Sequence, residues 1–414
     1  MPQFRPFKGV RPNKDIAGEF STKSVDSYET EKLQNELSAN SNSFLHIIKP
    51  TWEESSLETV QKHLKVADNF QQFIKSENAE SDKPAFYIYQ ITKPNKQNIR
   101  GIIGLVNIDD YENQLIKKHE ETLTKRVELF ANYLQHIHFH AEPVLLTYPN
   151  NQRIDLLMDV EMKRKPVAIF KDKDENQHQL WLVENRLNLQ QFKDSIEKYD
   201  ALYIADGHHR MESSQVYTAE MRKQNKNFLG NEPFNYTLAM LVSDKELIIK
   251  DFNRLLKDLN GNSKEEFIEK LKEKFDVTER GENAFFPSKK HHIGMYLDGN
   301  FYGLFVKKEA LTEKGLSELD TYLFEEFILK PILDIHNSRN DERIGFLRGT
   351  GDIEGVKQLK QKVDSNEFQL AFFFYPVIAA DLQKIADLGL KMPPKSTYIE
   401  PKPLSGLTIF DLKE

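Results

Sequence analysis

The chain has 414 residues, of which 39% are hydrophobic, and its formal net charge is -7 with a pI near 6.0. This composition is typical of a folded protein of two or three domains, and the acidic balance argues against a global basic surface, so we expect no nucleic acid partner. The absence of cysteine from the sequence excludes disulfides, thiolate metal sites and thiol nucleophiles.

The first residues, "MPQFRPFKGVRP", carry prolines and charges where a signal peptide needs an unbroken apolar stretch. The most apolar run, "LAFFFYPVIAA" at 370–380, is far shorter than the ~20 residues that cross a bilayer, and it reads as a buried strand. These features predict no membrane partner, and the absence of cysteine favours the bacterial cytoplasm. The sequence leaves the oligomeric state open.

Strand-like and helix-like segments alternate along the chain, which predicts an α/β or mixed α+β protein. Residues 43–50 and 84–92 are rich in β-formers and predict strands, and the polar stretch 51–77 between them predicts a helix. Residues 101–108, "GIIGLVNI", predict a buried strand, and a loop is expected at 109–117.

Residues 118–137 predict an amphipathic helix, because apolar residues recur at steps of three or four: Leu123, Val127, Phe130, Leu134 and Ile137. The first turn of this helix would hold His119, Glu120 and Glu121. Further strands are predicted at 142–148, 166–172 and 178–184, before a charged helix at 188–199.

The last third predicts two strands leading into a helix over 234–257, and a helix that begins with a capping box, Ser263 followed by Glu266. Asp298-Gly299 between alternating apolar residues predicts a hairpin. We expect three segments: an N-terminal α/β segment (1–94), a central core (95–232) and a C-terminal α+β domain (233–414).

The stretch "ALYIADGHHRMESS" at 201–214 predicts a strand that turns directly into a helix, and such a turn suits phosphate through its backbone N–H groups and helix dipole. Gly207 would let backbone approach a ligand, and Arg210 would offer a planar fork to phosphate oxygens. His208 and His209 could donate hydrogen bonds, and Asp206 could hold Mg²⁺ or cap the helix. A polar turn with a purely structural role, or a zinc pair formed by the histidines, are the alternatives.

Two other stretches are candidates for the same site. In "KKHEET", Glu120 and Glu121 suit a first helical turn for dipole reasons alone, but a carboxylate beside a phosphate cradle can also take the proton of an attacking hydroxyl. In "MPPKST" at 392–397, a rigid diproline turn carries Lys395, which we expect near the phosphates, although a plain surface turn would look the same.

Together these motifs resemble the free L-serine kinases related to SerK, which share the fold of ParB and sulfiredoxin: His119-Glu120 comes first and Asp206-Gly207-His208-His209-Arg210 follows. With "FRPFKGVRP", "IIGLVNIDDYENQLIKKHEET" and "KMPPKSTYIEPKPLSGL", the chain is also similar over nearly its full length to bacterial proteins grouped as a domain of unknown function. The resemblance implies a ParB/sulfiredoxin-like nucleotide-binding core within a larger chain. It also implies that Glu120, with His119 beside it, acts as the catalytic base and that the 206–210 turn holds nucleotide phosphates.

The resulting hypothesis is a small-molecule kinase that uses Mg²⁺ and transfers a phosphoryl group from ATP or ADP to the hydroxyl of free L-serine or a similar metabolite. Its partners would be a nucleotide and an amino acid. The alternative is a non-catalytic, ParB-like nucleotide-binding regulator, in which Glu120 only tunes a helix end.

Overall fold

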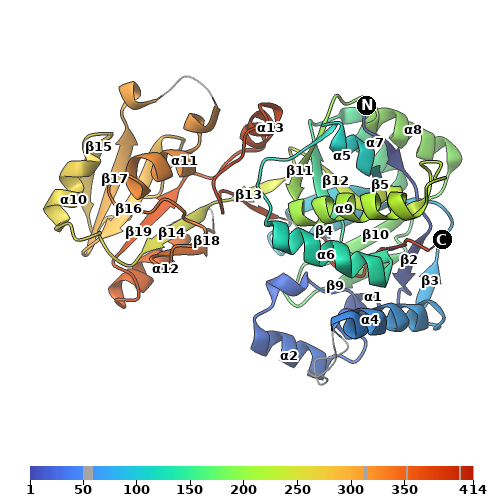
Figure 1. The fold of residues 1–414 in the computed structure, drawn as a ribbon. Helices are drawn as coiled ribbons and strands as arrows, with labels where there is room; N and C mark the ends of the chain where they lie inside the picture. Colours follow the sequence, from blue (N-terminus) through green and yellow to red (C-terminus); the bar gives the residue numbers. More distant parts are fainter. Residues whose placement is uncertain (50–58, 312–314, 351–352, 401, 414) are drawn as a thin grey trace. The chain divides into compact units, whose positions relative to one another are not determined.

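The computed structural model describes residues 1–49, 59–311, 315–350, 353–400 and 402–413. It divides into two compact units. Unit 1 comprises Met1–Lys117, Thr122–Leu247 and Pro401–Glu414, and unit 2 comprises Lys118–Glu121 and Ile248–Glu400. Both units combine helices with sheets, so the predicted mixed α+β class is confirmed (Figure 1).

The main sheet of unit 1 has nine strands in the order β6-β11-β8-β12-β5-β4-β10-β9, with β1 added beside β5. The strands are β1 (Phe4–Arg5), β4 (Phe86–Thr92), β5 (Asn98–Asn107), β6 (Ile116–Lys117), β8 (Val144–Tyr148), β9 (Ala168–Lys171), β10 (Gln177–Val183), β11 (Leu202–Asp206) and β12 (Tyr236–Ser243). The strands predicted at 84–92, 101–108, 142–148, 166–172 and 178–184 are therefore confirmed. Every residue of β8 and β12 is buried, which is why these central strands read as continuous apolar runs instead of alternating ones.

Helices surround this sheet. They are α1 (Ala17–Phe20), η1 (Val25–Ser27), α2 (Thr30–Ala39), α3 (Leu45–Ile48), α4 (Thr59–Ile74), α5 (Ile108–Glu112), α6 (Thr124–Ile137), α7 (Gln152–Glu161), α8 (Arg186–Ile196), α9 (His208–Gln224) and η2 (Pro233–Asn235). In Figure 1, α6 and α9 lie side by side over strands of the sheet. Helices α7 and α8 contribute Ile154, Met158, Phe192 and Ile196 to the buried core of the sheet.

A second, smaller sheet in unit 1 has the order β3-β2-β21-β7. It joins β2 (Gly9–Pro12), β3 (Ala79–Ser81), β7 (Phe139–His140) and β21 (Ile409–Asp411). The pairing of β21 with β2 and with β7 brings the last residues of the chain beside the first ones. Residues 402–413 thereby belong to unit 1, where Lys402 contacts Asp206 at the end of β11.

Unit 2 contains a six-stranded antiparallel sheet in the order β15-β17-β16-β19-β14-β18 and a short ladder of β13 with β20. The strands are β13 (Ile248–Lys250), β14 (Phe252–Leu256), β15 (Phe275–Gly281), β16 (His292–Leu297), β17 (Asn300–Val306), β18 (Ile344–Arg348), β19 (Leu370–Phe374) and β20 (Tyr398–Glu400). The predicted strand within 370–380 and the predicted hairpin at Asp298-Gly299 are both confirmed. Asp298 and Gly299 have φ values of 48° and 78°, which suits the tight two-residue turn.

Both faces of this sheet are covered. The helical elements are α10 (Lys264–Leu271), η3 (Lys308–Ala310), η4 (Gly315–Glu318), α11 (Asp320–Phe324), the π-helix η5 (Glu325–Leu329), α12 (Ile353–Asp364) and α13 (Ala379–Asp387). Along β19, Leu370, Phe372 and Phe374 join the core that includes α10 and α11. Ala371 and Phe373 join the core that includes α12, because successive side chains of a strand point to opposite faces.

Two predictions in the first third of the chain are wrong. Residues 45–48, expected in a strand, form α3, where Phe44, Leu45 and Ile47 are buried and the Ser43 hydroxyl accepts a hydrogen bond from the Leu45 amide. The apolar run therefore reflects burial and not strand alternation. The expected loop at 109–117 contains α5, which Asn107 caps, and β6, which pairs with β11. Part of the helix predicted at 51–77 forms α4, and residues 50–58 lie outside the described residues.

Two helix predictions also require correction. Helix α6 begins at Thr124, so His119, Glu120 and Glu121 are not its first turn. The carbonyl groups of Lys118 and His119 instead accept hydrogen bonds from the Lys391 ammonium and the Met392 amide. Residues 252–256 form strand β14, buried at all five positions between β18 and β19, where a helix was expected. This five-residue stretch, which contains Asn253 and Arg254, is too short to show a periodicity that separates strand from helix.

The strands of residues 1–94 share one sheet with strands of residues 95–232. The division into segments at 94 and 232 stays a prediction. Among the described residues, no helix combines the length and the apolarity that a membrane crossing requires.

The capping box at Ser263 gives a direct test of local stability. The Ser263 hydroxyl accepts from the Glu266 amide at 3.2 Å, and the Glu266 carboxylate accepts from the Ser263 amide at 2.8 Å. We expect Ser263→Ala to lower the free energy of unfolding of unit 2 by about 1 kcal/mol in urea denaturation. Ser263→Asp, which keeps a capping oxygen, should retain nearly the full stability, and equal losses for both variants would contradict the capping role.

Candidate functional site

The turn between β11 and α9 has the geometry that the sequence predicts. Strand β11 ends at Asp206 and helix α9 starts at His208, with Gly207 between them in the left-handed region (φ 94°, ψ 28°). A Cβ atom on Gly207 would lie 2.8 Å from the nearest guanidinium nitrogen of Arg210. Glycine is required here both for its backbone conformation and because the Arg210 side chain folds back over its Cα.

Arg210 lies in an alternating chain of charges. Its Nη2 contacts Asp206 Oδ2 at 2.9 Å and its Nη1 contacts Glu142 Oε1 at 2.6 Å. The other oxygen of Asp206 contacts the Lys402 ammonium at 2.8 Å. The side chains of Arg210 and Asp206 are 21% and 26% exposed, so the cluster is open to solvent on one side. Two cations and two carboxylates meet at the positive end of the α9 dipole.

This arrangement determines what an anion must do to bind. The guanidinium fork can grip a phosphate through two parallel hydrogen bonds, but carboxylates already occupy that position. A phosphate would therefore replace Glu142 on Arg210, with Lys402 as a second cation of the same cluster. These ion pairs are partly exposed and each contributes on the order of 1 kcal/mol, so the exchange costs little.

The two histidines of the turn have different surroundings. His208 is buried, whereas His209 is half-buried and its Nε2 accepts a hydrogen bond from the Leu123 amide at 3.1 Å. Across the described ranges, no group of three or more His, Cys, Asp or Glu side chains could hold a metal ion. The structure thus offers no support for the alternative of a zinc pair at His208 and His209.

The first two turns of α9 hold the residues directly before α6 and a tyrosine of α5. Tyr111 donates its hydroxyl to Glu212 Oε1 at 2.9 Å, and the Thr122 hydroxyl donates to Glu212 Oε2. The hydrogen bond between Leu123 and His209 adds a third attachment. Residues 122 and 123 are therefore fixed against the same helix that begins with the candidate phosphate turn.

His119 and Glu120 belong to unit 2. His119 is 1% exposed, and its carbonyl accepts from the Met392 amide at 2.8 Å. Glu120 follows in an irregular segment and is partly exposed. The structure therefore brings His119 and Glu120 together with the predicted "MPPKST" turn, which begins at Met392.

That turn is tied down by buried groups. Arg254, 1% exposed, donates Nη2 to the Pro394 carbonyl at 3.1 Å, and the Ser396 hydroxyl donates to the Pro393 carbonyl at 2.7 Å. Lys395 at the tip is exposed, has a φ of 55°, and its ammonium lies 5.5 Å from the centroid of the Phe252 ring. Arg254 is a structural anchor that the sequence reasoning did not identify.

The predicted residues therefore fall into two groups. Asp206, Gly207, His208, His209 and Arg210 lie together in unit 1, and His119, Glu120 and Lys395 lie in unit 2. That the two groups line a common cleft stays a prediction. Glu142 and Lys402 join the first group although neither was predicted. Lys402 lies in a stretch quoted for the family resemblance, "KMPPKSTYIEPKPLSGL", but nothing in its pattern points to Asp206.

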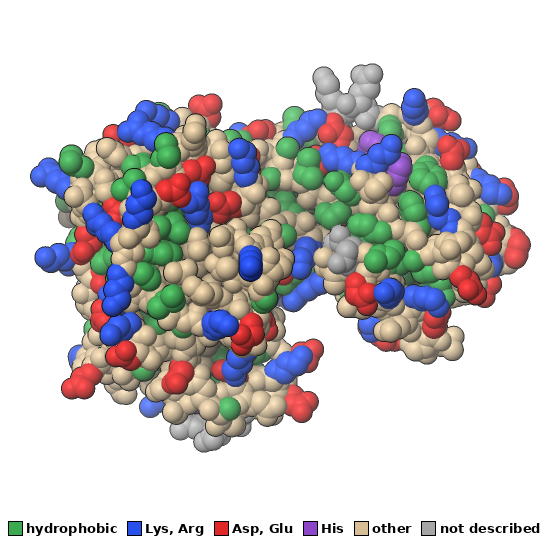
Figure 2. Space-filling view, turned by 180° about the vertical axis from the view of Figure 1, so that it is seen from behind, with side chains coloured by type: hydrophobic (Ala, Val, Ile, Leu, Met, Phe, Trp, Pro, Cys, Tyr) green, Lys and Arg blue, Asp and Glu red, His purple; other side chains and the backbone are tan. Residues whose placement is uncertain are grey.

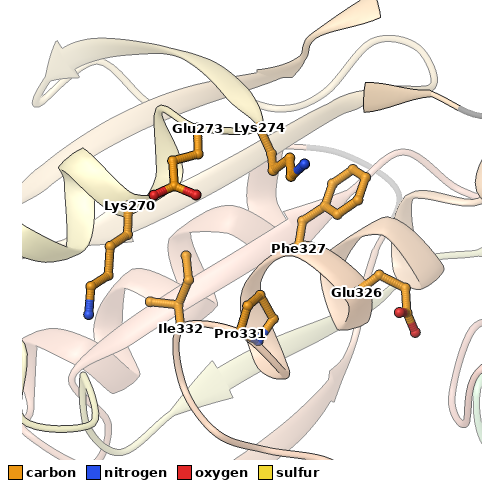
Figure 3. Close-up of a pocket in the computed structure, with 7 residues that line it drawn as sticks. All are labelled: Lys270, Glu273, Lys274, Glu326, Phe327, Pro331 and Ile332. Carbon is orange, nitrogen blue, oxygen red and sulfur yellow. The ribbon is translucent and has the colours of Figure 1, made fainter. Parts of the chain in front are cut away.

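A separate pocket of about 420 Å³ in unit 2 contains none of the predicted residues (Figure 3). It lies between the end of α10 and the π-helix η5, and its lining includes Lys270, Glu273, Lys274, Glu326 and Phe327. Lys274 points toward Phe327, with the ammonium 5.6 Å from the ring centroid. On the face drawn in Figure 2, Lys and Arg side chains are interspersed with Asp and Glu. The expected absence of a nucleic acid partner stays a prediction.

The chain is thus a mixed α+β protein with an Asp-Gly-His-His-Arg strand-to-helix turn. The model of a family described as "Protein of unknown function (DUF1015)" matches residues 4–322, and the chain belongs to this family. The predicted membership in a family grouped as a domain of unknown function is confirmed. No curated protein matches the chain.

Among solved structures, a mutant of a free serine kinase in complex with ADP is 13% identical, with a TM-score of 0.36 over 75% of this chain and 92% of that one. SbnI with C-terminal truncation from Staphylococcus aureus is 11% identical, with a TM-score of 0.38 over 73% of this chain and 85% of that one. A conserved hypothetical protein from Pyrococcus furiosus is 13% identical, with a TM-score of 0.34 over 75% and 95%. At these values the similarity carries no conclusion about activity, and the ParB/sulfiredoxin-like core stays a prediction.

His140 beside the charged cluster provides a test by pH. Burial, and secondarily the positive charge of Arg210, lowers the pKa of His140 to about 4. The unfolded chain binds the proton near pH 6.5 and the folded chain only near pH 4, so stability is full above pH 6.5 and falls as the pH drops from 6.5 to 4. We expect His140→Gln to flatten this part of the stability profile, measured as unfolding midpoints in urea from pH 7 to 4. An unchanged slope would contradict a buried neutral His140.

Proposed function

We propose that this protein is a phosphotransferase in which the Asp206–Arg210 turn and Lys402 bind nucleotide phosphates, and Glu120 accepts the proton of an acceptor hydroxyl. The donor is ATP or ADP, and the acceptor class is a small hydroxyl-bearing amino acid such as free L-serine. In phosphoryl transfer the protein mainly positions the groups and stabilises charge, so these few side chains account for the chemistry required of the chain.

The observation that carries the proposal is Arg210 folded over Gly207 at the N-terminus of a 17-residue helix. This combination gives a phosphate a guanidinium fork, a close approach to backbone and the positive end of a helix dipole. The second cation, Lys402, contacts the same Asp206 carboxylate. A merely structural turn would not need a partly exposed arginine held by two carboxylates at this point.

Covalent geometry supports the role of Glu120. Thr122 and Leu123 hydrogen-bond to Glu212 and His209 on α9. Two peptide units join Glu120 to Thr122, so their Cα atoms are at most about 7 Å apart. Glu120 thus directly precedes a stretch of chain that is hydrogen-bonded to α9.

The residues of the turn suit Mg²⁺ only if it binds together with the nucleotide. Asp206 uses both carboxylate oxygens, one on Arg210 and one on Lys402. Mg²⁺ is usually held by one or two carboxylates together with substrate phosphates, and not by a cage of protein ligands. Asp206 and Glu142 are the carboxylates that would hold it once phosphates take over Arg210 and Lys402, and the ion would neutralise charge on the phosphates. The alternative is a regulator that binds nucleotide without turnover.

The substitution Glu120→Gln distinguishes the enzyme from the regulator. Removing the base should reduce formation of phosphorylated amino acid from ATP or ADP and L-serine by at least ~100-fold, because general base catalysis contributes about 10²–10⁴-fold. Nucleotide affinity in calorimetry should stay unchanged.

Glu121→Gln is the matched control, since it removes the same charge from the adjacent exposed residue. Equal losses for both variants would contradict the assignment of Glu120. Nucleotide binding without any phosphorylated product from the unmodified protein would favour the regulator.

Glu142 should compete with phosphate for Arg210. In the absence of Mg²⁺, we expect Glu142→Gln to tighten ADP binding about fivefold at low salt, because it removes the carboxylate that contacts the guanidinium at 2.6 Å. The gain should shrink at high salt as screening weakens the ion pair. Glu220→Gln, which removes an exposed carboxylate farther along α9, is the control, and weaker ADP binding in Glu142→Gln would contradict the competition.

A further inference from the structure

Unit 1 contains a pocket of about 370 Å³ whose lining differs chemically from the charged turn. It is formed by α1, α3, α4 and the loops that follow α2 and α4. In Figure 1, α1 and α4 lie next to each other in the blue part of the chain. The pocket has a volume at the lower end of the range of small-molecule sites.

The described residues that line this pocket include no Asp, Glu, Lys or Arg. This is unusual in a chain of which 29% is charged, and it decides which ligands fit. A phosphate, a carboxylate or a zwitterionic amino acid placed here would find no Asp, Glu, Lys or Arg in the lining and would lose hydration with little compensation. The pocket therefore selects for uncharged ligands.

Most of the lining consists of amide and hydroxyl side chains, and two of the amides are already oriented. Asn42 donates Nδ2 to Glu19 Oε2 at 2.7 Å, and Asn69 donates Nδ2 to the His46 carbonyl at 3.1 Å. Each bond uses the Nδ2 group of its amide, so the side-chain oxygens of Asn42 and Asn69 are left as acceptors. Such fixed groups bind a ligand at a lower cost in side-chain entropy.

Further amides in the lining have unused hydrogen-bonding capacity. Within the part of the chain that the structure describes, the side chains of Gln72 and Asn78 make no hydrogen bond to protein. Each offers two donors and one acceptor oxygen. A ligand that carries several groups which both donate and accept, as hydroxyl groups do, matches this set.

The remaining part of the lining is apolar. Phe20 and Phe73 stack with ring centroids 4.4 Å apart and an angle of 17° between their planes, and both are buried at 3% and 8% exposure. Ile16 and Ile47 also belong to the lining. The pocket thus combines a hydrophobic wall with a rim of neutral donors and acceptors, which suits a compact ring bearing hydroxyl groups.

We propose that this pocket binds a neutral, polyhydroxylated small molecule through the amides of Asn42, Asn69, Gln72 and Asn78. A sugar and a nucleoside share this chemistry, and the experiment distinguishes them. The site is independent of the proposed phosphotransferase activity, because none of its residues belongs to the Asp206–Arg210 turn or to the 118–121 segment.

The test measures ligand binding to the full chain by calorimetry and saturation-transfer NMR. The neutral probes are glucose, N-acetylglucosamine and adenosine, and L-serine is the charged comparison. We expect one of the neutral probes to bind with a dissociation constant of about 1 mM or tighter, and L-serine not to compete for that site. Gln72→Ala should weaken this binding at least fivefold. Gln71→Ala, its neighbour on α4 outside the pocket, should leave it unchanged.

Because both glutamines are surface residues of α4, an unchanged thermal midpoint will show that the variants fold. Asn69→Ala provides a second variant, with an expected loss of similar size. The proposal is overturned if no neutral probe binds with a dissociation constant of about 1 mM or tighter, if Gln72→Ala and Asn69→Ala bind like the unmodified chain, or if L-serine displaces the bound probe. Binding of adenosine alone identifies a nucleoside site, and binding of glucose or N-acetylglucosamine alone identifies a sugar site.

Discussion

The ion pairs of Arg210 with Asp206 and Glu142 are the interaction on which the candidate phosphate site depends. They exist because Gly207 has no side chain and adopts a left-handed conformation, which lets the guanidinium fold back over the turn. Each pair is partly exposed and therefore worth about 1 kcal/mol or less. In the proposed function, a phosphate carrying two charges would displace Glu142 at about that cost, so the cluster would serve as a preformed but replaceable binding position.

Helix α9 connects this position with the preceding chain. Its first turn carries Arg210, and Glu212 and His209 hold Thr122 and Leu123. His209, Arg210 and Glu212 thus lie within the first five positions of one helix. In the proposed reaction, the base Glu120 would therefore directly precede residues that are hydrogen-bonded to the helix carrying Arg210.

Local features were predictable from the sequence, and contacts between residues far apart in the sequence were not. The β11–α9 turn, the Asp298-Gly299 hairpin and the capping box follow from residues that lie next to each other, where propensity and turn geometry act directly. Lys402 lies 196 residues from Asp206, and it reaches this carboxylate only because β21 joins the small sheet of unit 1. The start of α6 was predicted too early because the carbonyl groups of Lys118 and His119 bind residues near position 391, which no local pattern reveals.

The pattern of chain crossings has a consequence for dissecting the molecule. The backbone passes from one unit to the other after Lys117, Glu121, Leu247 and Glu400. Removing everything beyond Leu247 would take away Lys402 and strand β21 along with unit 2, and a fragment starting at Ile248 would lack the short segment 118–121. A single cleavage therefore cannot separate unit 1 from unit 2. Expressing unit 1 alone requires joining its three stretches of polypeptide with engineered linkers.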